Sequence, residues 1–171
     1  FFFITQVLKE RLPYYSYSIL DAIAEQDRSI SKKHTRELFR ITNHYRPESI
    51  IAAGSPVAAC SMTMARPTAT KFCIGNAEPS AEVAEVLKAY GCTVKIGDTG
   101  ALLEESLTEL GGTDMLYIGC CDNYAELFDI ALKHVNEKSI IVVEGIHCNK
   151  AIKRWWQEVV KSPIAILTHD F

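Results

Sequence analysis

The chain has 171 residues, 48% of them apolar, and a formal net charge of −3. This size and apolar content suit one folded domain with its own core, and the small negative charge argues against a nucleic-acid-binding surface. No apolar run approaches the roughly 20 residues that a membrane helix needs. The six cysteines lack the spacing of a disulfide scaffold, so we expect a reduced, cytoplasmic protein.

Short runs of β-branched and apolar residues alternate with helical stretches along the chain. The six runs are 49–53, 71–75, 93–97, 115–119, 139–144 and 164–168. Such alternation predicts an α/β protein in three layers, a mostly parallel sheet between two layers of helices. We expect 49–53 and 115–119 to be parallel neighbours at its centre.

Helical periodicity precedes and follows these runs. A helix over 30–45 is expected ahead of the first strand, with Ser29 or Ser31 as its N-cap and Pro47 just beyond its end. We predict that residues 1–48 form a helical segment that packs on a core made by 49–171, the two together being one structural domain. Five crossover helices are expected at 57–66, 79–90, 100–110, 124–135 and 150–161.

The tyrosine-rich stretch 11–18 is amphipathic. We expect it to pack on the core or to act as a lid, in preference to stacking on nucleic-acid bases.

Glycine and polar residues follow each predicted strand. Because ligands bind at the carboxyl ends of the strands in open α/β sheets, these exits are the places to look for chemistry. They are Gly54–Ser55, Gly75–Asn76, Gly97–Asp98, Gly119 and Glu144–Gly145.

Three stretches of the chain form a recognisable set: RELFRITNHYRPESIIAAGS, the GD after the third run, and EGIHCNKAIKRWWQEVVKSPIAILTHDF. Together they resemble the class I S-adenosylmethionine-dependent methyltransferases, in particular a small O-methyltransferase-like group found in bacteria. The resemblance spans residues 11–171. It implies a Rossmann-like methyltransferase fold, S-adenosylmethionine as cofactor and a small-molecule methyl acceptor. It also implies a final antiparallel strand, for which no residues remain after the sixth run.

The resemblance places the family's cofactor residues on the strand exits, with several losses. Ala52 and Ala58 stand where the family has an acidic residue and a second glycine, and Gly75 replaces the carboxylate that holds the ribose hydroxyls. Asp98 keeps the position that receives the adenine amino group, although it can equally cap the following helix. We therefore expect weak cofactor binding, with a Kd at or above roughly 100 μM. The expected cofactor-binding residues are Gly54, Ser55, Asn76, Glu78, Gly97, Asp98 and Gly119.

No divalent metal is expected. The family's metal-binding positions fall on Gly119, Glu144 and Gly145, and one carboxylate does not provide the cluster of oxygen ligands that Mg²⁺ or Ca²⁺ requires. Five other side chains follow the fourth and fifth predicted strands, namely Cys120, Cys121, Asp122, His147 and Cys148. They form either a zinc site or, as the alternative, a set of inert thiols and polar loop residues.

Glu144 and His147 are the candidate catalytic residues, with the histidine as a general base or as a loop-packing side chain. Two functions remain open. One is a weakened S-adenosylmethionine-dependent methyltransferase that acts on oxygen or nitrogen. The other is a catalytically inactive binding or assembly module with the same fold, and in either case we expect a homo-oligomer through the sheet edge as one possible assembly.

Overall fold

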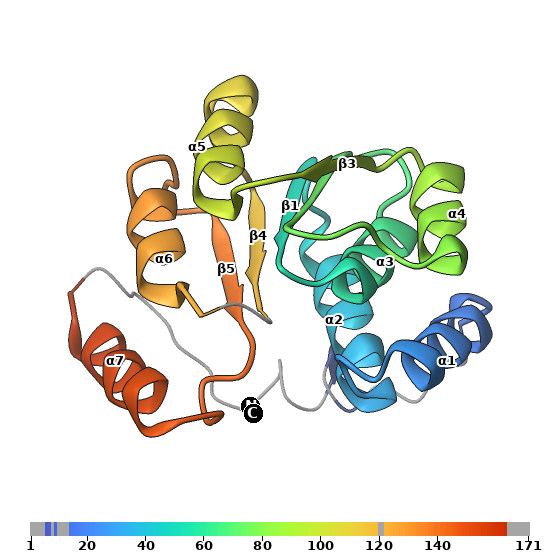
Figure 1. The fold of residues 1–171 in the computed structure, drawn as a ribbon, viewed down its shortest axis with the longest axis horizontal. Helices are drawn as coiled ribbons and strands as arrows, with labels where there is room; N and C mark the ends of the chain where they lie inside the picture. The colour runs from blue at the N-terminus through green and yellow to red at the C-terminus, as the bar shows by residue number, and fades with distance from the viewer. Residues whose placement is uncertain (1–5, 8, 10–13, 120–121, 164–171) are drawn as a thin grey trace.

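The computed structural model describes residues 6–7, 9, 14–119 and 122–163. Its centre is a sheet of five parallel strands in the order β3-β2-β1-β4-β5 (Figure 1). The strands are β1 Ser49–Ala53, β2 Thr70–Gly75, β3 Thr93–Ile96, β4 Met115–Ile118 and β5 Ile140–Val143.

The predicted strand runs and the structure agree closely. β1 has the expected bounds, and the pairing of Ile50 with Met115 confirms that β1 and β4 are parallel neighbours. The agreement reflects how strongly consecutive β-branched and apolar residues favour a strand that is covered on both faces. The sixth run, 164–168, lies outside the described residues.

The described part of the chain contains seven helices around this sheet. They are α1 Ser16–Asp27, α2 Lys32–Tyr45, α3 Pro56–Ala65, α4 Ala81–Ala89, α5 Thr99–Leu110, α6 Tyr124–Leu132 and α7 Lys150–Lys161. Ser31 is the N-cap of α2, because its hydroxyl accepts a hydrogen bond from the backbone N–H of His34 at 3.2 Å. No helix among these elements is long and apolar enough to cross a membrane.

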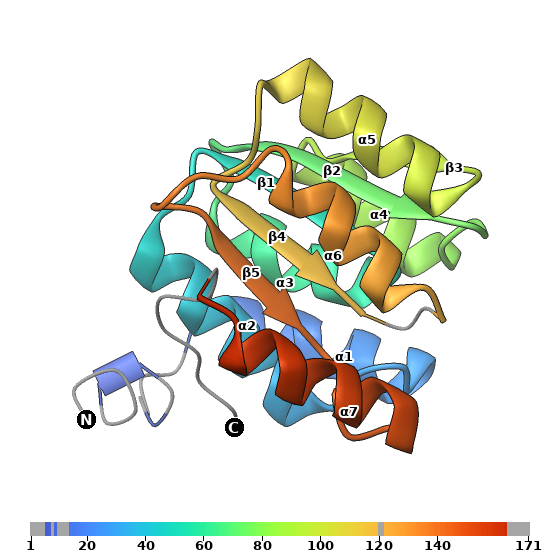
Figure 2. The same cartoon turned by 90° about the vertical axis from the view of Figure 1, so that its left-hand side faces the viewer.

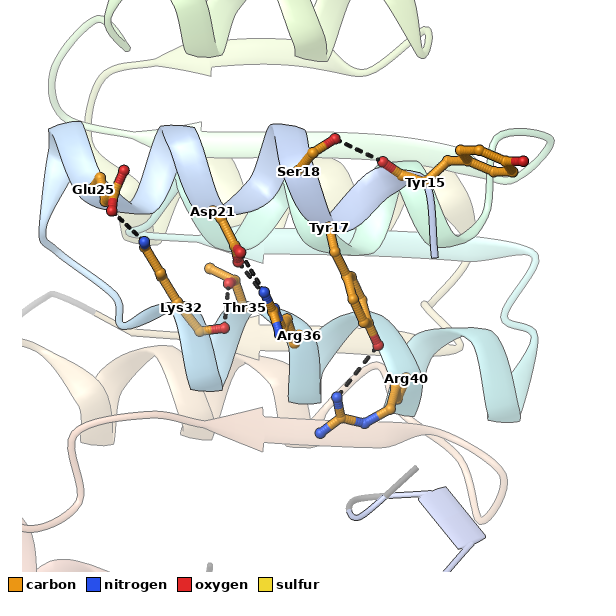
Figure 3. Close-up of polar contacts among 9 residues, drawn as sticks. All are labelled: Tyr15, Tyr17, Ser18, Asp21, Glu25, Lys32, Thr35, Arg36 and Arg40. Carbon is orange, nitrogen blue, oxygen red and sulfur yellow. Dashed lines mark hydrogen bonds and ion pairs between the residues drawn. The ribbon is translucent and has the colours of Figure 1, made fainter. Parts of the chain in front are cut away.

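The sequence interpretation expected a helical segment over 1–48, with 11–18 packing on the core or acting as a lid, but it gave no bounds for helix α1. Its buried residues Tyr17, Leu20, Ile23 and Ala24 have helical spacing, so the signal was present. Figure 3 shows how α1 is held on α2: the guanidinium of Arg36 donates to both carboxylate oxygens of Asp21. With this ion pair in place, α1 packs against both α2 and α3 and covers that side of the core.

The two faces of the sheet pack against different helices. Ala52, Cys73 and Tyr117 belong to the core cluster that includes α1, α2, α3 and α4. Their strand neighbours, such as Ile51 and Leu116, point to the opposite face and pack on α5 and α6. Tyr117 therefore faces α2, a placement that determines the site described next.

Candidate functional site

The strand exits lie side by side along one edge of the sheet. The backbone N–H of Gly54 donates to the carbonyl of Ile74, and that of Gly119 donates to Ala53. In the same way Glu144 donates to Ile118, one strand further out. Neighbouring strands are about 4.8 Å apart, so Gly54 and Glu144 are separated by roughly two such spacings. The tertiary structure thus brings the predicted cofactor and catalytic positions to one edge.

The exit of β1 is shaped to bring backbone close to a ligand. Gly54 has a φ of 91°, a left-handed conformation that favours glycine, and it leaves no Cβ in the way. The hydroxyl of the next residue, Ser55, accepts from the N–H of Ala58 at 3.2 Å and caps α3. Ala58 is fully buried, so its methyl group lies in the core and does not project from the solvent-facing side of the loop.

Asp98, at the exit of β3, caps helix α5. Its Oδ1 accepts from the backbone N–H of Ala101 at 2.8 Å, and the residue is exposed. An ionised carboxylate has further acceptor sites, so the capping bond does not prevent Asp98 from accepting a hydrogen bond from a ligand. Gly97, with a φ of 158°, forms the bend between β3 and Asp98.

The exit of β2 is open. Gly75 is partly exposed and carries no side chain, and the following residues Asn76 and Glu78 are exposed. A Cβ at Gly75 would meet only ordinary contact, 3.7 Å from the carbonyl oxygen of Ala77. The backbone at position 75 therefore accepts a Cβ, although this chain carries no side chain there.

Glu144 is held by two side chains from other elements. The hydroxyl of Tyr117 donates to its Oε2, and the Nδ1 of His34 lies 3.2 Å from its Oε1. A Cβ at Gly119 would collide with the hydroxyl of Tyr117, so glycine at that position leaves room for the Tyr117–Glu144 contact. A neutral His34 that donates from Nδ1 to the carboxylate presents Nε2 as an acceptor.

His34 is a site residue that the sequence interpretation missed. It comes from α2, 110 positions before Glu144, and nothing in its neighbourhood marks it as functional. The one available signal is its place on the helical stripe that continues through Leu38, Ile41 and Tyr45, because that stripe faces the sheet.

A cavity of about 1300 Å³ opens beside Glu144, between α2, β5 and α7. In Figure 1, α2 and α7 lie on either side of the lower end of β5. All four residues of β5 are half-buried and α7 has no buried residue, so both elements border this space. The loop from Glu144 to Cys148 also lines it, which places the second candidate catalytic residue, His147, at the cavity wall.

The helix α7 contributes aromatic side chains to the cavity. Trp155 packs edge-on against Phe128 of α6, with 5.4 Å between ring centroids. The ring centroid of Trp156 lies 6.1 Å from that of Trp155. Figure 2 shows α7 alongside β5. These rings give one side of the cavity an aromatic wall.

The zinc and inert-thiol alternatives near the β4 and β5 exits stay predictions, whereas three other cysteines have a clear packing role. Cys120 and Cys121 lie outside the described residues, and the part of the chain that the structure describes holds no group of three or more metal-ligating side chains. Cys60, Cys73 and Cys92 are buried free thiols, and burial raises the pKa of Cys60 to about 12. These three thiols are protonated at neutral pH and pack as small apolar residues.

No protein-family model and no curated protein matches the sequence, but solved structures match the fold. The methyltransferase PaMTH1 of Podospora anserina, solved with S-adenosylhomocysteine, has a TM-score of 0.69 at 14% identity, over 94% of this chain and 86% of that one. The O-methyltransferase TomG of Streptomyces achromogenes, involved in tomaymycin synthesis and solved with S-adenosylmethionine, has a TM-score of 0.67 at 16% identity, over 88% and 80%. An O-methyltransferase of Bacillus cereus with S-adenosylhomocysteine has a TM-score of 0.62 at 16% identity, over 93% and 85%. The chain therefore has the Rossmann-like class I methyltransferase fold that its sequence motifs predict.

Proposed function

We propose that this chain is an S-adenosylmethionine-dependent methyltransferase that acts on an oxygen or nitrogen nucleophile of a small molecule. The observation that supports this best is the common edge formed by the β1, β3, β4 and β5 exits. Across the sheet these exits carry Asp98 after β3, the left-handed Gly54 after β1 and Glu144 after β5, an arrangement that would let the cofactor bind over β3 to β1 and the acceptor bind next to β5. The fold shared with methyltransferases solved with this cofactor adds support.

The residues of the inner exits would hold the cofactor. Gly54 allows close backbone approach, and Asp98 accepts from the adenine amino group. Five further residues complete this proposed set, namely Ser55, Asn76, Glu78, Gly97 and Gly119. Because Gly75 supplies no carboxylate for the ribose hydroxyls, the proposal includes weak binding, with a Kd at or above roughly 100 μM.

When bound, the cofactor supplies an electrophilic methyl group. Glu144 would orient the acceptor and take its proton, directly or through His34, whose Nδ1 contacts the carboxylate. His147 at the cavity wall would be the alternative base. Neither role requires a metal ion, in keeping with the single carboxylate at these exits.

The second candidate function is a catalytically inactive binding or assembly module, favoured by the missing carboxylate at Gly75. Among the described residues β5 is the last strand of the sheet, and its half-buried residues would then be the natural place for self-association, because strand edges recruit other chains. Three buried cysteines present as free thiols support a reducing, cytoplasmic compartment for either function.

Calorimetric titration with S-adenosylhomocysteine distinguishes the two functions. A saturable Kd between about 100 μM and 1 mM supports the methyltransferase, and methyl transfer from labelled S-adenosylmethionine to an acceptor would then complete the case. Absence of binding at several millimolar would leave the inactive module.

A further inference from the structure

We propose that the end of the cavity next to α2 binds the ammonium group of an organic cation with an aromatic or apolar body, through Glu37 and Glu144. The inference rests on the proposed function in one respect, since such a molecule would be the methyl acceptor. The binding itself depends only on the residues around the cavity.

Glu37 is the first observation. It lies on α2 one helical turn after His34, so the two side chains are neighbours on the face that lines the cavity. Its side chain is 9% exposed, and its Oε2 is buried without a hydrogen-bond partner among the described residues. The other oxygen, Oε1, forms an ion pair with the exposed amine of Lys33 at 3.6 Å.

A buried carboxylate oxygen without a donor is costly, and native proteins rarely retain one. A ligand with N–H donors would remove this cost once the Glu37 carboxylate turns from its buried position toward the cavity that the residue lines. Glu144 lines the same cavity and presents further acceptor capacity, because a carboxylate has about four lone-pair sites and its contacts with Tyr117 and His34 use only part of them. An ammonium group has three donors and suits two carboxylates.

The charge of the cavity wall points in the same direction. Among its described residues there are five carboxylates and one lysine, Lys138. The wall is therefore strongly negative when its two histidines, His34 and His147, are neutral, and it favours a cation over an anion or a neutral ligand. The five carboxylates are Glu37, Asp129, Glu137, Glu144 and Glu158.

The opposite wall fits an apolar or aromatic body. Trp155, Trp156 and Phe128 line it, together with the apolar residues of β5. Aromatic faces bind flat apolar groups and also attract cations. With Glu37 and Glu144 at the α2 end and aromatic rings on another wall, the cavity is complementary to an arylalkylamine. Its volume is ample for a molecule of that size.

The test compares matched ligand pairs in which an amine is replaced by a hydroxyl group. The pairs are tyramine and 4-(2-hydroxyethyl)phenol, and tryptamine and 3-(2-hydroxyethyl)indole, titrated at pH 7.5 by calorimetry or by chemical-shift changes. The variants are the wild type, Glu37→Gln, and the control Glu158→Gln, which removes another carboxylate of the same wall. We expect at least one amine to bind tenfold or more tightly than its alcohol.

We expect Glu37→Gln to lose that preference, while Glu158→Gln keeps its amine affinity within about threefold. Equal binding of amine and alcohol by the wild type overturns the inference, as does the absence of binding by either amine at 10 mM. An amine preference that survives in a folded Glu37→Gln protein also overturns it, because the cation then binds elsewhere. Amine binding without S-adenosylhomocysteine binding would keep this inference and remove the proposed methyltransferase activity.

Discussion

Replacing Asp98 with alanine separates its two roles, because the cap of α5 and the proposed contact with adenine depend on the same carboxylate. The capping bond, from the N–H of Ala101 to Oδ1, is 2.8 Å long. Substituting alanine at such an N-cap costs about 1 kcal/mol. For a protein of 171 residues, that loss lowers Tm by about 2–4 °C.

Loss of the proposed contact with adenine would cost more free energy than loss of the helix cap. A hydrogen bond to a charged acceptor contributes about 1.5–3 kcal/mol, which corresponds to a 10- to 150-fold change in Kd. From a starting Kd near 100 μM, Asp98→Ala should therefore bind S-adenosylhomocysteine at about 1 mM or above. Asp98→Asn should keep both the cap and most of the affinity, since an amide oxygen also accepts.

Ser80→Ala is the matched control. Ser80 caps α4 through a 3.4 Å bond from Val83 and has no proposed contact with the cofactor. Thermal unfolding and calorimetry of the variants should show a comparable loss of stability for Ser80→Ala with unchanged affinity. If Asp98→Ala loses stability but keeps the wild-type affinity, the carboxylate is a helix cap alone, and its proposed cofactor role is wrong.

Three further predictions follow from the geometry. Gly75→Asp should tighten S-adenosylhomocysteine binding tenfold or more in calorimetry, because the backbone there is not left-handed and accepts a Cβ at ordinary contact distance, and the new carboxylate would bind the ribose hydroxyls; an unchanged Kd would refute the explanation for weak binding. In urea unfolding, Gly112→Ala should cost more than about 2 kcal/mol, since its Cβ would lie 2.7 Å from a carbonyl oxygen at a φ of 115°, whereas Gly111→Ala, with open space at a φ of 69°, should cost about 1 kcal/mol. Burial raises the pKa of Cys60 to about 12, so iodoacetamide at pH 8 should modify the exposed Cys148 and spare Cys60, as read by peptide mass spectrometry. Stability should also fall above about pH 9, where the unfolded thiol loses its proton and the folded one retains it; equal labelling of the two thiols would contradict the buried placement.

Local sequence determined most of the architecture. The run SIIAA forms β1 at its predicted bounds because consecutive β-branched and apolar residues favour a buried strand, and Ser31 caps α2 because its hydroxyl meets the first free N–H groups of the helix. The strand and the cap are short-range effects, and a sequence pattern records them directly. Alternation of such elements predicts a parallel sheet, and the doubly wound strand order common in this fold class places β1 beside β4.

Local sequence was less informative for α1. Its helical stripe lies next to a tyrosine-rich segment, and the ion pair between Asp21 and Arg36 that holds it on α2 joins residues 15 positions apart. Nothing in either segment alone indicates that pairing. The packing of one helix on another follows from tertiary contact, which no periodicity records.

The candidate site divides in the same way. That the strand exits meet at one edge follows from parallel topology, so the sequence could propose Gly54, Asp98 and Glu144 as one set. Only the tertiary structure placed His34 against Glu144 and left Glu37 buried with an oxygen that has no partner. Residues 110 positions apart become neighbours through the packing of α2 on the sheet, and the burial that makes a lone carboxylate costly exists only once that packing has formed.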